Sequence, residues 1–250
     1  MKKTVAILIA VLSLASCKFI SVSPDAKNIF KEVVTGTGET VTVNHDMLTG
    51  FNGIRVNGSF DVKYSQTDAY SVSVTAKESL HESIVLSVAD GILTLSTKDK
   101  VQIADDVDVE ICGPDLTSIT VNGSGDMEIP GPVSVDNAID VTINGAGDVE
   151  VNKVCCADMS VSINGAGDLD LEGINCGNLA VKINGAGDVD ISGMDVRDFR
   201  ITISGAGDAK VSGKADTADI NISGAGEIDA RGLQCSSVRK KASGISSIKM

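Results

Sequence analysis

The sequence is poor in aromatic side chains. It has no tryptophan, two tyrosines and five phenylalanines, so that only 3% of its residues are aromatic. This scarcity argues against single-strand nucleic-acid binding and against aromatic-lined carbohydrate clefts, because both rely on stacking platforms. With 42% hydrophobic residues, 26 glycines and only four prolines, the chain is predicted to be an ordered, turn-rich globular protein with an aliphatic core.

Cationic side chains are also scarce. The 250 residues carry 34 acidic and 21 basic groups, and the formal net charge is -13. Proteins that bind nucleic acid concentrate Lys and Arg to neutralise phosphates, and an acidic surface repels a polyanion. The charge balance therefore argues against nucleic acid as a partner.

The N-terminal residues have the pattern of a targeting segment. Two lysines precede an apolar run from Val5 to Leu14, which is too short to cross a bilayer as a helix. The four residues that end at Cys17, Leu-Ala-Ser-Cys, resemble a bacterial lipobox, in which the cysteine becomes the lipid-modified N-terminus. We therefore predict a lipoprotein signal peptide at residues 1–16 and acyl chains, palmitate among them, on Cys17. An ordinary secretory signal with an incidental cysteine is the alternative.

A lipid on Cys17 is expected to anchor the mature protein in the cell envelope. More than one acyl chain on one residue gives a stable membrane anchor. Lys18 stands where an aspartate would indicate retention in the inner membrane, so the outer membrane is favoured. Both a periplasmic and an extracellular placement of the protein are consistent with the sequence. Residues 17–50 are predicted to be a lipidated tether with modest structure at most.

A repeat of about 20 residues occupies the second half of the chain. Near-copies of Asn-Gly-Ala-Gly-Asp begin at Asn122, Asn144, Asn164 and Asn184, and divergent copies begin at Ser204, Ser223 and Ser243. Successive copies start 22, 20, 20, 20, 19 and 20 positions apart. A unit this short cannot bury its own apolar face, so the regular spacing predicts a solenoid of stacked coils.

Each repeat alternates apolar and polar residues with a period of two. Between positions 141 and 151, the apolar side chains Val141, Ile143, Val149 and Val151 fall on odd positions and polar ones on even positions. This is the pattern of strands with one buried face. Because parallel crossovers are right-handed in nearly all proteins, the sequence predicts an all-β fold, a right-handed parallel β-helix (β-solenoid) of about 20-residue coils.

The segment before the repeats is rich in strand patterns but is not repetitive. Residues 53–64 predict an isolated first coil, since the Val-Asn-Gly-Ser at 56–59 recurs at 121–124. Further strands are predicted at 70–76, 84–89, 92–97 and 107–111, with a hairpin turn at Asp90-Gly91 and a short helical turn at 79–83. We interpret residues 51–114 as a non-repetitive N-terminal cap on a solenoid that spans residues 115–250.

These segments together resemble a known family. The run from Phe51 to Val62, the strand pair at Asp90 to Leu95, the entry at Gly113 to Ser118 and the repeated Gly-Ala-Gly-Asp are similar to the head GIN domain of putative auto-transporter adhesins. This is a domain of unknown function that is common in lipoproteins of the Bacteroidota, and the resemblance spans about residues 51–236. It implies a β-solenoid shaped like the pectate-lyase-like helices but without their catalytic residues, and a role in cell adhesion.

Stacking the repeats places acidic side chains in two columns. The aspartate row consists of Asp126, Asp148, Asp168, Asp188, Asp208 and Glu227; the second acidic row consists of Glu128, Glu150, Asp170, Asp190 and Asp229, with Lys210 interrupting it. Residues 122–230 hold 19 acidic and 6 basic side chains, a balance of -13, so all the net charge lies on the solenoid. Carboxylates about 4.8 Å apart repel by roughly 1 kcal/mol per neighbour even in high dielectric, so the rows need compensation.

Three explanations of these rows remain open. In the first, each carboxylate accepts hydrogen bonds from amides of the adjoining glycine turn, stays solvated and keeps strand edges soluble. In the second, the two rows supply oxygen ligands for Ca²⁺, which takes about six to eight of them, although the spacing of the nine-residue calcium β-roll is absent. In the third, the acidic face binds a basic partner.

An asparagine column runs beside the acidic rows. Its members are Asn57, Asn122, Asn144, Asn164 and Asn184. Stacked side-chain amides at a turn predict a hydrogen-bonded ladder, and a ligand-binding row is the alternative.

Two cysteines share a repeat position. Cys156 and Cys176 each lie 12 residues after the start of their repeat and should stack about 4.8 Å apart, within the range for a disulfide. A Cys156–Cys176 disulfide in an oxidising periplasm is one prediction, and small buried thiols are the other. Zinc is disfavoured, because paired Cys-x-x-Cys spacing is absent and His45 and His81 are the chain's two histidines.

No convergent catalytic set can be assembled from the sequence. It contains no nucleophile elbow or P-loop, and Arg197 and Arg200, the bases that pectate-lyase-like chemistry would place beside calcium, lie in a single coil. The sequence therefore predicts an outer-membrane lipoprotein without cofactor or catalysis, whose solenoid is a binding, adhesion or scaffold module for a surface glycan or protein ligand. A calcium-dependent polysaccharide-active enzyme and a structural envelope spacer are the alternatives.

Overall fold

The computed structural model describes residues 32–250, so the predicted signal peptide at 1–16 and the predicted lipidation of Cys17 lie outside it. Of the described residues, 70% lie in strands and almost none in helix. Within the described range the helical content is one short 3₁₀ segment, η2 (Glu78–Ser83), which is the helical turn predicted beside the cap strands. No helix in that range is long and apolar enough to span a membrane.

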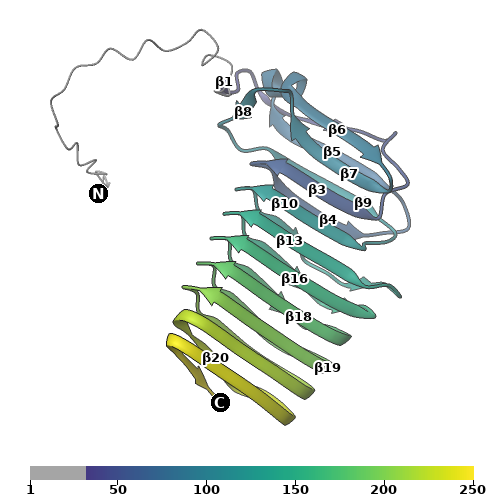
Figure 1. The fold of residues 1–250 in the computed structure, drawn as a ribbon. Coiled ribbons are helices and arrows are strands. Elements are labelled where there is room, and N and C mark those ends of the chain that lie inside the picture. The colour runs from purple at the N-terminus through teal and green to yellow at the C-terminus, as the bar shows by residue number, and fades with distance from the viewer. Residues whose placement is uncertain (1–31) are drawn as a thin grey trace, which may run out of the picture. The chain divides into compact units, whose positions relative to one another are not determined.

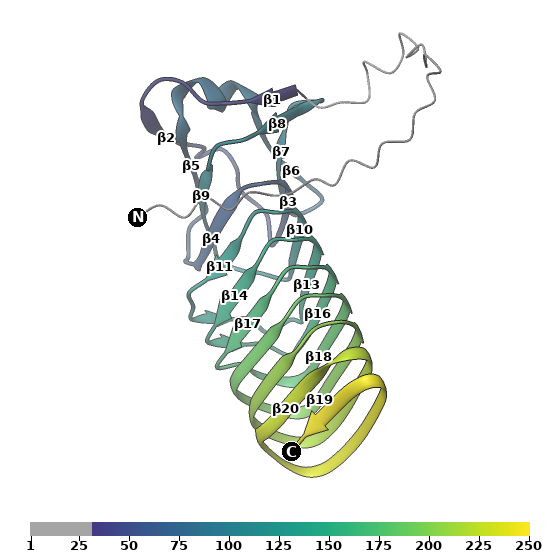
Figure 2. The same cartoon turned by 90° about the vertical axis from the view of Figure 1, so that its left-hand side faces the viewer.

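Successive coils stack as parallel strands into a β-solenoid, as Figures 1 and 2 show. The first face consists of β3 (Gly53–Gly58), β10 (Ser118–Gly123), β13 (Ile139–Gly145) and β16 (Asp158–Gly165), and continues in β18 (Asn175–Gly185), β19 (Val189–Gly205) and β20 (Ala209–Lys249). The second face consists of β4 (Asp61–Gln66), β11 (Met127–Ile129), β14 (Val149–Asn152) and β17 (Leu169–Glu172), and continues in β19 and β20. A short third side holds β12 (Val133–Ser134), β15 (Val154–Cys155) and the start of β18. The predicted solenoid of about 20-residue coils is thus confirmed.

The register of the coils follows the sequence repeat. Asn122, Asn144, Asn164 and Asn184 pair with one another in successive parallel strands, and Ser204 continues the column. Strand alternation then directs every second side chain inward. Val141, Ile143, Val149 and Val151 are all at most 1% exposed. The interior is an aliphatic column, because the repeat supplies Val, Ile and Leu at each inward position.

Glycine is required where the coils turn between the first and second faces. Gly145 and Gly165 have φ of 149° and 156°. A Cβ atom on either would lie 1.9 Å from the carbonyl oxygen of the glycine one coil earlier. No side chain fits between these two backbones, so glycine at this position lets the corners of successive coils stack directly on one another.

Both faces of the solenoid continue into the cap. On one side β7 (Ile92–Thr97) pairs with β3 and, through the predicted hairpin at Asp90-Gly91, with β6 (Ile84–Ala89). On the other side β9 (Asp108–Gly113) pairs with β4 and with β5 (Ser71–Lys77). The predicted isolated first coil is present as β3 and β4, which pair directly with β10 and β11.

The cap begins earlier in the chain than the sequence predicts. Two strands lie in residues 32–50, which belong to the predicted tether: β1 (Glu32–Val34) pairs with β8 (Val101–Ile103), and β2 (Thr40–Asn44) pairs with β5. Most side chains of β2 are exposed, so its sequence does not show a buried face from which a strand could be predicted. Backbone pairing with β5 holds β2 in place, and composition alone does not reveal that interaction.

Candidate functional site

An acidic groove runs along the second face of the solenoid. Its volume is about 850 Å³, and it is lined by every member of the aspartate row and of the second acidic row, together with Lys210. The residues between the two rows, such as Met127, Val149 and Leu169, are buried and point into the core. Strand alternation therefore presents two lines of carboxylates on the outer surface, and the parallel register keeps both lines straight over the coils.

Each carboxylate of the aspartate row is tied to the next coil. The backbone N–H of Asp148 donates to Oδ1 of Asp126 at 3.0 Å, and that of Asp168 donates to Oδ1 of Asp148 at 2.9 Å. The same contact recurs at 2.8, 2.8 and 2.7 Å through Asp188, Asp208 and Glu227. Hydrogen bonds to an ionised acceptor are stronger than neutral ones and offset the repulsion along the row. This geometry favours the first explanation, in which amides of the neighbouring turn compensate the carboxylates.

The aspartate row extends into the cap through a residue that the sequence reasoning missed. Oδ1 of Asp61 accepts the backbone N–H of Asp126 at 3.2 Å. Partial burial, followed by the charges of Asp126 and Asp108, raises the pKa of Asp61, while the hydrogen bond from Asp126 opposes that rise. The sequence could have revealed Asp61 as a member of the row, because Asn57-Gly-Ser-Phe-Asp61 has the same spacing as Asn122-Gly-Ser-Gly-Asp126.

Cations compensate the second acidic row at its ends. Lys63, which pairs in register with Glu128 from the cap, lies 3.2 Å from that carboxylate. Lys210 lies 3.6 Å from Asp190, and Arg231 lies 2.6 Å from Asp229. These pairs are largely exposed, so each contributes little to stability, but together they confine the uncompensated charge to the middle of the groove.

The middle of the groove holds Glu150 and Asp170 in adjacent coils. The Glu150 carboxylate accepts a hydrogen bond from Asn152 at 2.8 Å, whereas the part of the chain that is described offers the Asp170 carboxylate neither an ion pair nor a hydrogen bond. Desolvation raises the pKa of Asp170, and the charges of Asp190, Glu150 and Glu172 raise it further. The groove is therefore most electronegative at this point.

The rows form lines of separate carboxylates. In residues 32–250, no group of three or more His, Cys, Asp and Glu side chains is arranged to hold a metal ion. Ca²⁺ takes about six to eight oxygens at roughly 2.3 to 2.6 Å, and one oxygen of most aspartate-row members already accepts an N–H. A calcium role stays a prediction.

The asparagine column forms a ladder of side-chain amides beside the groove. Nδ2 of Asn122 donates to Oδ1 of Asn57 at 2.8 Å, and Asn144, Asn164 and Asn184 each donate to the asparagine one coil earlier at 2.8, 3.0 and 2.9 Å. The stacked asparagines therefore form the hydrogen-bonded ladder that the sequence predicts. This network fixes the register of the coils next to the acidic rows.

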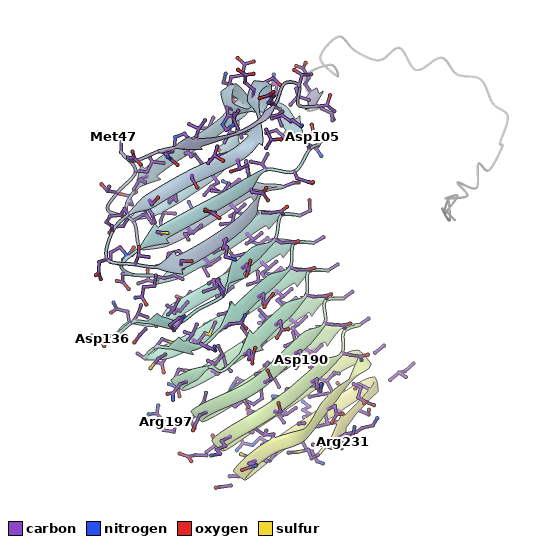
Figure 3. The ribbon with its side chains drawn as sticks, turned by 180° about the vertical axis from the view of Figure 1, so that it is seen from behind. Met47, Asp105, Asp136, Asp190, Arg197 and Arg231 are labelled. Carbon is purple, nitrogen blue, oxygen red and sulfur yellow. The ribbon has the colours of Figure 1, made fainter. Side chains whose placement is uncertain are left out.

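Neither arginine that the enzyme alternative would need lies in the groove. Arg197 donates to Asp198 at 3.0 Å and to Asn178 at 3.2 Å, and Figure 3 shows it along the margin that also carries Asp136, away from Asp190. Arg200 pairs with Asp219 at 3.3 Å. Both side chains bind carboxylates outside the groove lining.

The five described cysteines, Cys112, Cys155, Cys156, Cys176 and Cys235, are free thiols. Cys156 and Cys176 are buried at equivalent positions of adjacent coils, as their repeat spacing predicts, but no disulfide joins them in this structure. Each thiol donates to the carbonyl oxygen two residues on, at 3.4 and 3.3 Å. The two histidines, His45 and His81, line a separate aliphatic hollow of about 420 Å³ in the cap.

Solved structures from Bacteroides and Parabacteroides species have the same fold. A putative adhesin of Bacteroides fragilis superposes with a TM-score of 0.72 at 19% identity, covering 86% of this chain and 99% of its own. A putative lipid binding protein of Parabacteroides distasonis has a TM-score of 0.69 at 21% identity, covering 87% and 99%. A putative adhesin of the same species has a TM-score of 0.68 at 19% identity, covering 88% and 100%. These likenesses establish the fold.

Sequence similarity places the chain in a family. No curated protein matches it significantly. The family model described as putative auto-transporter adhesin, head GIN domain, matches residues 50–174 and again residues 162–250. The two matches overlap at residues 162–174 and together span residues 50–250. The chain therefore belongs to the family of the putative auto-transporter adhesin head GIN domain.

Proposed function

We propose that this protein is a cell-envelope lipoprotein whose solenoid head acts as an adhesion module, without catalysis, by binding a cationic protein surface in the acidic groove. The observation that carries the proposal is the groove itself, about 850 Å³ lined by two registered rows of carboxylates. A long, predominantly acidic groove suits an extended basic segment, whose Lys and Arg side chains can meet successive coils.

The distribution of charge within the groove supports a protein ligand. Lys63, Lys210 and Arg231 already neutralise the ends of the second acidic row, so a ligand gains most at Glu150 and Asp170. A glycan ligand is less well served, because the chain has no tryptophan and the groove lining contains no aromatic ring on which a sugar could stack. Membership of a family of putative adhesins agrees with binding as the activity.

Binding of a fluorescent decalysine peptide, followed by anisotropy at low and at physiological salt, tests the groove. Each carboxylate in the middle of the row faces a different lysine, so the double variant Glu150→Gln/Asp170→Asn should weaken binding by about tenfold or more. Raising the salt should weaken wild-type binding, because the contacts are exposed.

The matched control removes the same charge elsewhere. Asp136 and Asp195 are exposed and lie outside the groove lining, so Asp136→Asn/Asp195→Asn lowers the net negative charge equally without touching the groove. This control should bind decalysine within about twofold of wild type. Equal weakening by both double variants, or no binding by wild type, would overturn the groove as the ligand site.

The anchoring part of the proposal rests on the Leu-Ala-Ser-Cys sequence at 14–17. Cells grown with labelled palmitate should incorporate the label into the wild-type protein and not into Cys17→Ala. The variant should also leave the membrane fraction, because a polypeptide without its acyl chains loses the hydrophobic anchor. Labelling of the variant, or its unchanged sedimentation with membranes, would contradict lipidation at this residue.

A further inference from the structure

Two cysteines stack at one corner of the solenoid. Cys156 follows β15 and Cys176 lies in β18, and the register Cys155↔Asn175 places the two at equivalent positions of adjacent parallel strands. The backbone N–H of Cys156 donates to the carbonyl oxygen of Asn175 at 3.1 Å. Parallel neighbours lie about 4.8 Å apart, within the roughly 4.4 to 6.8 Å between Cα atoms that a disulfide spans.

The two thiols also share a buried environment. Both side chains are buried, at 8% and 7% exposure. The neighbouring Cys176 thiol lowers the pKa of Cys156, and Cys156 in turn raises the pKa of Cys176. Because parallel neighbours already lie within the Cα spacing of a disulfide, a disulfide between Cys156 and Cys176 needs a change of side-chain torsion and no rearrangement of the backbone.

The other described cysteines lack such a neighbour. The column that holds Cys176 continues through Val196 and Ala215, so two coils without sulfur separate it from Cys235. Cys155 points outward opposite Asn175. Cys112 lies in β9 of the cap. The pairing of Cys156 with Cys176 is therefore specific.

We propose that Cys156 and Cys176 form a reversible disulfide that fastens two neighbouring coils beside the middle of the acidic groove. The coils joined are those that carry Glu150 and Asp170, the members of the second acidic row that lack a cation. Their carboxylates repel across β14 and β17, which belong to the same two coils that the bridge would join through β15 and β18. The bridge is independent of any ligand in the groove.

The chemistry is thiol–disulfide exchange with an external disulfide, either oxidised glutathione or the active-site disulfide of a thiol oxidoreductase. The Cys156 thiolate attacks one external sulfur and releases the first thiolate. Cys176 then loses its proton, and its sulfur displaces the second thiolate from the mixed disulfide. The protein gives up two electrons and two protons, and the external disulfide is reduced to two thiols. The neighbouring Cys176 thiol lowers the pKa of Cys156, which suits Cys156 to the first attack.

Peptide mapping after oxidation tests the bridge. The purified, reduced protein is incubated folded with oxidised glutathione, and free thiols are counted before and after. Trypsin releases residues 154–182, which contain Cys155, Cys156 and Cys176, and this peptide should lose two hydrogen masses. A second cleavage after Glu172 separates Cys176 from the other two, so the halves should stay joined until a reductant is added. The midpoint of thermal unfolding should rise by about 5–10 °C on oxidation.

Serine variants assign the sulfur atoms. Cys156→Ser and Cys176→Ser should each abolish the linkage and the thermal shift, whereas Cys155→Ser and Cys235→Ser should retain both. Two results would overturn the proposal: a linkage that survives Cys156→Ser and disappears in Cys155→Ser, or retention of all thiols in the folded wild type under conditions that oxidise the unfolded chain.

Discussion

The backbone N–H of Asp188 lies 2.8 Å from Oδ1 of Asp168, so each aspartate of the row serves the coil that follows it. The charge of the row and its hydrogen bonding can be separated by substitution. Asp168→Asn keeps an oxygen acceptor and removes a charge between two like neighbours, while Asp168→Ala removes both. We expect the alanine variant to be less stable than the asparagine variant by about 1 kcal/mol in urea unfolding, because it leaves the Asp188 N–H without its acceptor.

The control for that prediction is two residues away. Asp170 belongs to the second acidic row, accepts no backbone N–H and is surrounded by like charge, so Asp170→Ala should leave stability unchanged or raise it. Equal losses in Asp168→Ala and Asp168→Asn would show that the charge, and not the acceptor, matters in the aspartate row.

The asparagine ladder makes a quantitative prediction. Asn164 donates to Asn144 and accepts from Asn184, whereas Asn184 takes part in one amide–amide bond. With about 1 kcal/mol for each side-chain hydrogen bond, Asn164→Ala should cost about twice as much free energy of unfolding as Asn184→Ala. Chemical denaturation measured for both variants checks the ratio, and equal losses would mean that the ladder does not act through its individual bonds.

The corner glycines should tolerate substitution very unequally. A Cβ at Gly165 would meet a backbone carbonyl at 1.9 Å, so Gly165→Ala should destabilise by more than about 3 kcal/mol or prevent folding. A Cβ at Gly173 would lie 3.7 Å from its nearest neighbour, and only the positive φ of 68° opposes alanine, so Gly173→Ala should cost about 1 kcal/mol. Soluble yield and thermal unfolding distinguish the two, and similar behaviour would contradict the close approach of the coils.

The asparagine ladder and the acidic rows could be predicted because stacked coils bring residues one repeat apart in the sequence next to each other in space. Asn144 and Asn164 are 20 positions apart, and a 20-residue coil brings them into the same column, so the ladder and both acidic rows could be predicted from the sequence. The contact between Lys63 and Glu128 follows the same 65-residue offset as Asn57 and Asn122. The pairing of β2 with β5 could not be predicted, because most side chains of β2 are exposed and show no apolar alternation. The acceptor role of the aspartates also needed the structure, since their partner is a backbone N–H of the next coil and nearly every residue type carries that group.

Acid should stabilise the protein through Asp170 until other carboxylates begin to titrate. The folded state raises the pKa of Asp170 above its usual 3.8, so at a pH between the two values the folded protein holds more protons than the unfolded chain. Stability therefore increases as the pH falls from neutrality through that raised pKa, and it decreases as the pH rises. At lower pH the trend reverses, because Asp198, Glu227 and Asp229 have lowered pKa values and their protonation removes favourable partners.

Thermal unfolding from pH 7 down to the acid limb separates this contribution from the rest. Asp61 also has a raised pKa and titrates in the same direction, so the wild type should show the steepest gain on acidification. Asp170→Asn carries no ionisable group at that position and should be more stable than wild type at pH 7, with the difference vanishing as the pH falls through the raised pKa. High salt should shrink the difference at pH 7, because the repulsion from Glu150, Asp190 and Glu172 is screened. A difference that is constant with pH would show that Asp170 affects stability through its shape and not through its charge.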